Sequence, residues 1–146
     1  MRKIRVLFLC TGNSARSIMG ATLLQQLGGD AFEVFSAGTH PKGVNPFTVC
    51  VLEPLGIDMS EERSKNVSEF AERSFDYVIT VCDSAAEECP VFPGAPRRIH
   101  WSFADPAAVE GTGDEKLRAF QRTAREMKTR LGTFVPVARR SVGLRA

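Results

Sequence analysis

One short loop constrains this chain more than any other feature. It reads Cys10-Thr-Gly-Asn-Ser-Ala-Arg16-Ser17 and lies between an apolar run, Ile4 to Leu9, and a segment with helical spacing, Ser17 to Leu27. A run of the first kind is typical of a strand buried on both faces of a parallel sheet. Gly28-Gly29 is a helix-terminating signal. The N-terminal part of the chain is therefore predicted to be a strand, a loop and a helix.

The remaining pattern continues this alternation. Asn45-Pro46 combines a capping residue with proline at the first helical position, which predicts a helix ending by Gly56. A short helix is expected at 68–73, and further strands at 32–35, 77–81 and 97–101. Strands that alternate with helices indicate an α/β fold with a parallel sheet and right-handed crossovers. In such sheets, ligands bind at the carboxyl ends of the strands.

The final helix has the clearest periodicity. Its apolar residues recur at helical spacing, at Leu117, Phe120, Ala124, Met127 and Leu131. Asp114-Glu115 suits the positive end of the helix dipole, and Gly132 is predicted to close it. Residues 131–146 are then expected to form a basic tail.

Size and composition set broad limits. The 146 residues are expected to form a single catalytic domain, 1–146. A net charge of +2 does not favour nucleic acid as a partner. The apolar run before Cys10 is too short for a secretory segment, and no run approaches a membrane span. We therefore expect a cytoplasmic protein, whose four cysteines stay reduced.

The Cys10–Ser17 loop has the composition of an oxyanion site. A loop of this length can aim successive backbone N–H groups at a tetrahedral anion, and Arg16 can hold two of its oxygens. Gly12 permits close approach and unusual dihedrals, and Asn13 tolerates the left-handed region. The same positive field favours a thiolate at Cys10, to which Ser17 can donate a hydrogen bond. The predicted anion-binding residues are Thr11, Gly12, Asn13, Ser14, Ala15, Arg16 and Ser17. A buried cysteine in a glycine-containing turn is the alternative.

The loop resembles that of low-molecular-weight tyrosine phosphatases, and the wider pattern resembles the arsenate reductases built on that fold. The matching motifs are Ser36-Ala-Gly38, Gly43-Val-Asn-Pro46, Thr80-Val-Cys82 and His100-Trp-Ser-Phe-Ala-Asp-Pro106. The resemblance covers about residues 4–131. It implies a four-stranded parallel sheet flanked by helices on both faces.

Asp105 is the predicted general acid. Release of an oxygen from arsenic or phosphorus needs a proton donor, and the resemblance implies that Asp105 takes this role. An ordinary Asp-Pro turn is the alternative. Asp83 is a weaker candidate, and His100 is expected to be a strand residue with a satisfied hydrogen bond.

Two further cysteines, Cys82 and Cys89, distinguish a reductase from a phosphatase. The resemblance implies a relay in which Cys10 attacks arsenate, Cys82 attacks Cys10, and Cys89 attacks Cys82. Thioredoxin, or a similar dithiol protein, would then reduce the last disulfide, and no cofactor is implied. Two buried cysteines are the alternative, and this is the expectation for Cys50 on its apolar helix face. The spacing does not favour zinc, and we expect a monomer.

The segment between these two cysteines, Ser84 to Glu88, is helix-prone. A continuous helix would separate Cys82 and Cys89 by ~10.5 Å along its axis, whereas a disulfide needs Cα atoms within about 7 Å. We therefore hypothesise that this segment unwinds on oxidation.

Some of the resembling reductases hold potassium beside the loop. The matching positions are Asn13, Ala21, Ser36 and Lys65, of which Ala21 lacks a carboxylate and Lys65 replaces an acid. Either the Lys65 ammonium replaces the ion, or Lys65 is a solvated surface residue. Reductase is the first functional hypothesis, with a tyrosine phosphatase and a non-enzymatic oxyanion or redox sensor as alternatives.

Overall fold

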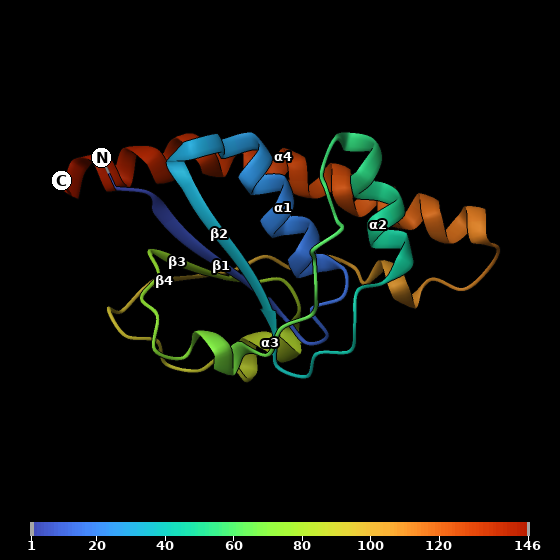
Figure 1. Ribbon diagram of the computed structural model, residues 1–146, viewed down its shortest axis with the longest axis horizontal. Helices are drawn as coiled ribbons and strands as arrows, with labels where there is room; N and C mark the ends of the chain where they lie inside the picture. The colour runs from blue at the N-terminus through green and yellow to red at the C-terminus, as the bar shows by residue number, and fades with distance from the viewer. Residues whose placement is uncertain (1, 146) are drawn as a thin grey trace.

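The protein is built around a four-stranded sheet in which all strands are parallel. The computed structural model describes the backbone of residues 2–145 and the side chains as far as residue 141. The strand order is β2-β1-β3-β4, with bounds Ile4–Cys10 for β1, Phe32–Gly38 for β2, Tyr77–Thr80 for β3 and Arg97–His100 for β4. Strand β1 pairs with β2 and β3 at the centre of the sheet (Figure 1). The predicted α/β class is confirmed.

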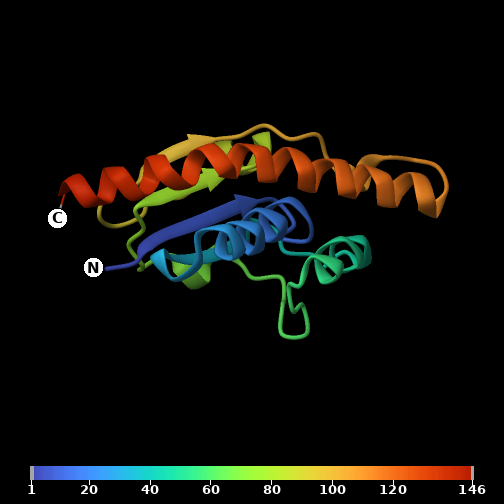
Figure 2. The same cartoon turned by 90° about the horizontal axis from the view of Figure 1, so that it is seen from above.

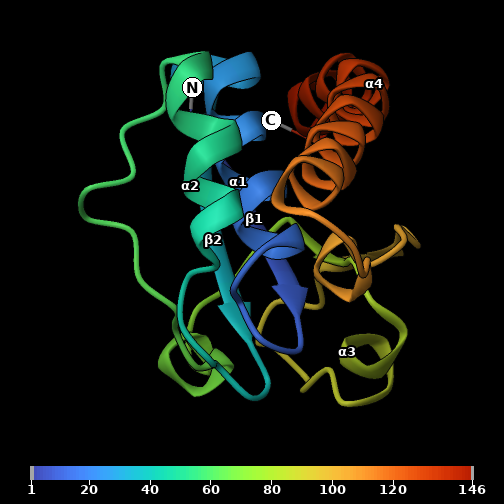
Figure 3. The ribbon, with the colours of Figure 1, turned by 90° about the vertical axis from the view of Figure 1, so that its right-hand side faces the viewer.

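Helices cover both faces of this sheet. Helices α1 (Arg16–Gly28) and α4 (Gly113–Arg145) pack beside each other on one face, and α2 (Pro46–Leu52) contacts both of them (Figures 2 and 3). The opposite side carries α3 (Asp83–Glu87) and a 3₁₀ turn (Val67–Phe70) (Figure 3). Further 3₁₀ turns are Gly29–Ala31, Glu53–Leu55 and Pro106–Ala108.

Local signals set most of the boundaries. The Asn45 side chain accepts a 2.9 Å hydrogen bond from the backbone N–H of Phe47, so α2 starts at the predicted proline. Gly29 adopts a positive φ of 59° at the end of α1, as the glycine pair predicted. Strand β2 is longer than predicted and runs to Gly38. The helix expected at 68–73 is a 3₁₀ turn that ends at Phe70.

Each face of the sheet has its own aromatic core. On the α1–α4 side, Trp101 packs against Phe8 and Phe134, with centroids 6.3 and 5.6 Å apart. On the other side, Phe35 packs against Phe70 and Phe75 at 5.6 and 5.7 Å. Burial of these rings on both faces stabilises the sheet by the hydrophobic effect.

Helix α4 does not end where the sequence predicted. Gly132 was expected to close it, but the helix continues to Arg145 through Pro136. Residues 131–146 are therefore not a free tail, at least as far as the described Arg145. Phe134 is 7% exposed and lies 5.0 Å, centroid to centroid, from Tyr77. Burial of this apolar stripe outweighs the glycine and proline stop signals.

The predicted site residues lie together at one edge of the sheet, at or after the carboxyl ends of β1, β3 and β4. In the sheet register Cys10 is paired with Gly38, Leu9 with Thr80, and Thr80 with His100. Cys82 and Asp105 follow β3 and β4. Within the described part of the chain, no helix is long and apolar enough to span a membrane.

Candidate active site

The Cys10 thiol lies at the base of the loop, where its residue is 4% exposed. The backbone N–H of Asn13 donates to Cys10 Sγ at 3.2 Å, and Ser17 Oγ lies 2.8 Å from the same sulfur. The predicted contact between Ser17 and the sulfur is therefore present. Two hydrogen-bonding groups therefore surround the Cys10 sulfur, next to the start of α1.

Asn13 connects this sulfur to a distant segment. Its side-chain oxygen accepts a 2.8 Å hydrogen bond from the backbone N–H of Lys65, and its amide nitrogen donates to Ser17 Oγ at 2.8 Å. Ser17 Oγ already accepts from Asn13, so its own proton is free to point at Cys10 Sγ. Asn13 adopts a φ of 44°, the left-handed conformation that the sequence predicted.

A second segment, residues 39–48, supports the loop from behind. Backbone N–H groups of His40, Lys42 and Asn45 donate to the carbonyls of Thr11, Gly12 and Ser14 at 2.8, 3.0 and 3.0 Å. The Thr48 hydroxyl donates to the Ser14 carbonyl at 2.8 Å. These bonds occupy the loop carbonyls on the outside of its curve. The loop is consequently held in place from several directions before any anion binds.

Two glycines allow this close packing. A Cβ on Gly38, at the end of β2, would lie 2.5 Å from the Thr11 carbonyl oxygen. A Cβ on Gly12 would lie 2.8 Å from the Lys42 side chain. Gly12 does not adopt a positive φ, so its role is close approach and not an unusual dihedral.

Arg16 and Asp105 face each other across the mouth of the loop. Arg16 Nη1 donates to the Phe103 carbonyl at 3.0 Å, and Arg16 Nη2 lies 3.6 Å from Asp105 Oδ2. The other Asp105 oxygen accepts from the backbone N–H of Ala107 at 3.0 Å. The Asp105 side chain remains 40% exposed, so it can reach solvent and a ligand. The Phe103 carbonyl and the Asp105 carboxylate therefore orient the Arg16 guanidinium, and Asp105 stays open to solvent.

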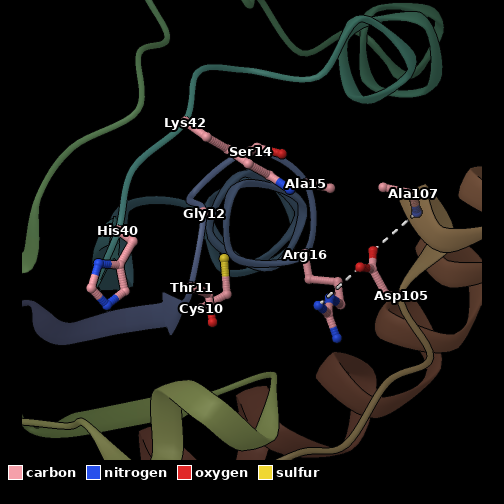
Figure 4. Close-up of a pocket in the computed structure, with 10 residues that line it drawn as sticks. All are labelled: Cys10, Thr11, Gly12, Ser14, Ala15, Arg16, His40, Lys42, Asp105 and Ala107. Carbon is pink, nitrogen blue, oxygen red and sulfur yellow. Dashed lines mark hydrogen bonds and ion pairs between the residues drawn. The ribbon is translucent and has the colours of Figure 1, made fainter.

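These residues enclose a cavity of about 280 Å³ above the Cys10 sulfur (Figure 4). Its lining residues are Cys10, Thr11, Gly12, Ser14, Ala15, Arg16, His40, Lys42, Asp105 and Ala107. No aromatic ring other than the His40 imidazole lines it. The sequence did not predict His40 and Lys42 as lining residues. The Gly43-Val-Asn-Pro46 motif directly after them could have indicated this position, because it starts α2 and so fixes the end of the segment that carries both residues.

Comparison with known proteins assigns this arrangement to a family. The model of the low molecular weight phosphotyrosine protein phosphatases matches residues 5–142. The chain belongs to this family.

The similar family members include arsenate reductases. The chain is 42% identical to the arsenate reductase of Halalkalibacterium halodurans over 134 residues, which cover 92% of this chain and 96% of that protein. It is 41% identical to the arsenate reductase of Bacillus subtilis, over 88% of this chain and 93% of that one. The solved thioredoxin-dependent arsenate reductase Cg_ArsC1' of Corynebacterium glutamicum superposes with a TM-score of 0.76 at 26% identity, over 95% of this chain but 63% of the other.

On this phosphatase-family fold, a second thiol lies against the loop. Cys82 is 8% exposed and occupies the N-cap position of α3. Its Sγ lies 3.3 Å from Thr11 Oγ1, in the residue next to Cys10. The structure therefore places Cys82 beside Thr11, one of the residues that line the cavity.

The third thiol, Cys89, lies further out, after the end of α3. It contributes to a separate cavity of about 150 Å³, which Arg98 and His100 also line. Burial raises the pKa of the Cys89 thiol, and the charge of Arg98 partly opposes that effect. Arg98 Nη2 also donates to the Pro90 carbonyl at 2.6 Å, which holds the residues after Cys89. All four cysteines are free thiols.

Cys50 departs from its prediction. It was expected to be buried on an apolar face of α2, but it is exposed. The buried face of α2 is formed by Thr48, Val51 and Leu52, and Cys50 points away from it.

His100 is engaged on both sides, as expected for a strand residue with satisfied hydrogen bonds. Its Nδ1 lies 2.8 Å from Thr80 Oγ1 and its Nε2 lies 2.9 Å from Asp83 Oδ1. Asp83 is thus paired outside the anion cavity, which leaves Asp105 as the carboxylate that lines it.

Lys65 is not a solvated surface lysine. Its side chain is 15% exposed, and its ammonium donates to the Arg63 carbonyl at 2.8 Å and lies 3.4 Å from Glu62 Oε1. It lines a cavity together with Ala21 and Ser36, two of the positions that match the potassium site. Among the described residues, no group of three or more His, Cys, Asp or Glu side chains is arranged to hold a metal ion.

Proposed function

We propose that this protein is an arsenate reductase that uses Cys10, Cys82 and Cys89 in sequence. The observation that carries the proposal is the 3.3 Å contact between Cys82 Sγ and Thr11 Oγ1. A hydrolase that acts on phosphate esters needs one nucleophile, one anion-binding loop and one acid, and has no use for a thiol at this position. The similarity to the arsenate reductases described above supports the same reading.

The first step is attack on arsenic. Backbone N–H groups of the loop and the Arg16 guanidinium bind arsenate above Cys10, and the Cys10 thiolate forms an S–As bond. An As–O bond breaks, and Asp105 transfers a proton so that the oxygen leaves as water. Arsenic remains As(V) at this stage. Asp105 is suitably placed because it lines the cavity and remains exposed.

The second step is the reduction. The Cys82 thiolate attacks Cys10 Sγ, the S–As bond breaks, and its electron pair stays on arsenic. Arsenic becomes As(III) and leaves as arsenite, while a Cys10–Cys82 disulfide forms. The position of Cys82 beside Thr11, the residue that follows Cys10, supports this step.

The third step transfers the disulfide from Cys10–Cys82 to Cys82–Cys89. The Cys89 thiolate attacks Cys82, which releases the Cys10 thiolate and forms a Cys82–Cys89 disulfide. Helix α3 lies between these two residues, and it is only five residues long. Its unwinding would bring the two sulfurs into range. Thioredoxin, or a similar dithiol protein, then supplies the two electrons that reduce this disulfide. We place the enzyme in the cytoplasm, where such donors keep thiols reduced, and we expect a monomer with one domain.

Arsenite release, with and without thioredoxin and its reductase, tests the proposal. We expect multiple turnovers only with the reducing system. Cys89→Ser should release about one equivalent of arsenite per enzyme and then stop, because the first two steps do not use Cys89. Cys50→Ser is the matched control and should behave as wild type, since Cys50 is exposed on α2.

The same assay separates the alternatives. A tyrosine phosphatase would hydrolyse aryl phosphates at the same rate in wild type and Cys89→Ser, and would release no arsenite. An oxyanion or redox sensor would bind or oxidise without turnover of either substrate. Either result would refute the reductase assignment.

A further inference from the structure

The basic side chains that line the cavity differ in their partners. Arg16 lies 3.6 Å from the Asp105 carboxylate, and His40 Nε2 lies 3.2 Å from Glu88 Oε2. The Lys42 side chain also lines the cavity. Among the hydrogen bonds and ion pairs of the described residues, none involves the Lys42 ammonium. Lys42 therefore contributes a positive charge that no carboxylate compensates.

The Lys42 backbone is fixed against the loop. Its N–H donates to the Gly12 carbonyl at 3.0 Å, in the same set of bonds that supports the loop from behind. Its side chain then passes over Gly12, where a Cβ would lie 2.8 Å from Lys42 Cε and 3.1 Å from Lys42 Cδ. In Figure 4 the Lys42 side chain extends from the segment of residues 39–48, across the loop, toward Ser14 and Ala15. The ammonium is thus directed at the cavity from the side opposite Asp105.

We propose that Lys42 is a substrate-binding residue that supplies a second positive charge for a free dianionic oxyanion. This proposal rests on the proposed use of the cavity as an oxyanion site and adds a residue to it. Arg16 carries one positive charge, so a dianion with two negative charges would be incompletely neutralised by Arg16 alone. The Lys42 ammonium compensates the remaining charge, with its stem packed on Gly12. An anion then lies between the Arg16 and Lys42 cations, above the Cys10 sulfur.

Equilibrium binding of inorganic phosphate, measured by titration calorimetry, tests this role without any redox step. Lys42→Met keeps most of the apolar stem and removes the charge. We expect the phosphate Kd to rise about tenfold, because a charge-assisted hydrogen bond of this kind is lost. Lys42→Arg should stay within about threefold of wild type, since the charge is retained. The difference in phosphate Kd between Lys42→Met and wild type should become smaller at high ionic strength, because salt screens the exposed Lys42 charge.

Lys3→Met is the matched control. It removes the same charge from an exposed residue that precedes β1, at the opposite end of the sheet. Its phosphate Kd should be unchanged. Circular dichroism and thermal unfolding of each variant check that the fold is retained. With arsenate as substrate, we expect Lys42→Met to raise KM with kcat preserved, as for a residue that binds ground state and transition state alike.

A phosphate Kd for Lys42→Met within about twofold of wild type would overturn the proposal, since the lost bond would then contribute less than expected. An equal rise in Kd for Lys3→Met would also overturn it, because net charge would explain the effect. Weaker phosphate binding by Lys42→Met in an enzyme that releases no arsenite would keep the Lys42 assignment and reject the reductase. The two proposals can therefore fail independently.

Discussion

The backbone N–H of Lys65 donates a 2.8 Å hydrogen bond to Asn13 Oδ1, and this bond determines which way the Asn13 amide points. A backbone N–H can only donate, so the Asn13 oxygen must face Lys65 and the NH₂ group must face Ser17. Ser17 Oγ accepts from this NH₂ group, so its own proton is available to the Cys10 sulfur, 2.8 Å away. A residue more than fifty positions along the chain thus orients the donors around the nucleophile.

Removing this amide should destabilise the protein and the loop together. Asn13→Ala leaves the Lys65 N–H without its partner in a part-buried site, and places alanine at a φ of 44°. We expect the free energy of unfolding in urea to fall by about 3 kcal/mol, and phosphate binding to weaken. Asn66→Ala is the control, because Asn66 caps an exposed 3₁₀ turn through a 2.9 Å bond from Ser68, and it should cost about 1 kcal/mol. Equal costs for the two variants would contradict the proposed network.

Asp105→Asn separates chemistry from binding. Asparagine can still accept the hydrogen bond from the Ala107 N–H, so the turn should be preserved. We expect first-turnover arsenite release to slow by about 100-fold or more, because the proton donor is lost. Phosphate binding should not weaken, since the carboxylate repels the anion. Rapid-quench kinetics measure the rate. Asp83→Asn, which removes the exposed partner of His100, should react as wild type. An unchanged rate in Asp105→Asn would exclude the acid role.

The pH dependence of the last thiol exchange should follow Cys89. Burial raises the pKa of Cys89, so only a small fraction is thiolate near neutral pH. Since the thiolate is the attacking species, formation of the Cys82–Cys89 disulfide should accelerate about tenfold per pH unit below that pKa. Arg98→Met removes the charge that lowers this pKa, which should move the profile to higher pH and slow the exchange at pH 7.

Quenched-flow mass spectrometry would record this disulfide. The control is Arg97→Met, the preceding residue on β4, whose side chain binds Ser141 instead. Superimposable pH profiles for Arg98→Met and wild type would show that Arg98 does not act on Cys89.

Potassium should have no specific effect. The Lys65 ammonium already binds the Arg63 carbonyl and lies beside Glu62, within the cavity that Ala21 and Ser36 line. A fixed ammonium there repels a second cation. Replacing sodium by potassium at constant ionic strength should leave both arsenite turnover and Tm unchanged. Lys65→Gln removes the charge and should create a potassium-dependent Tm. A strong rise of wild-type activity in potassium would refute this role for Lys65.

The C-terminal part of α4 should contribute to stability. Phe134 contacts Phe32, Tyr77 and Trp101, and is 7% exposed. We expect Phe134→Ala to lower the free energy of unfolding by about 3–4 kcal/mol, as for a large ring removed from a core. Val137→Ala, at a position that is 52% exposed, should change it by about 0.5 kcal/mol or less. Similar losses of unfolding free energy for Phe134→Ala and Val137→Ala, measured by urea unfolding, would mean that this segment is not packed on the sheet.

Features that contiguous residues encode could be predicted before the fold was known. The Cys10–Ser17 loop, the left-handed conformation of Asn13 and the cap of α2 at Asn45 all depend on local chemistry: a strand that runs into a short loop, the side chain of asparagine, and a capping residue before proline. The order of strands and helices also follows from local periodicity, and the handedness of parallel crossovers then limits the topology. The placement of Cys10 and Cys82 at one edge of the sheet follows from that topology.

Features that depend on contacts between distant segments could not be predicted in this way. Gly132 and Pro136 are stop signals in sequence, yet α4 passes through both, because Phe134 and Ala138 are buried against the sheet. Cys50 has apolar neighbours in sequence, yet it is exposed, because α2 turns its other face inward. Lys42, His40 and Lys65 reach the loop through contacts between distant segments. Burial and long-range hydrogen bonds depend on what the fold brings together, and no local pattern records them.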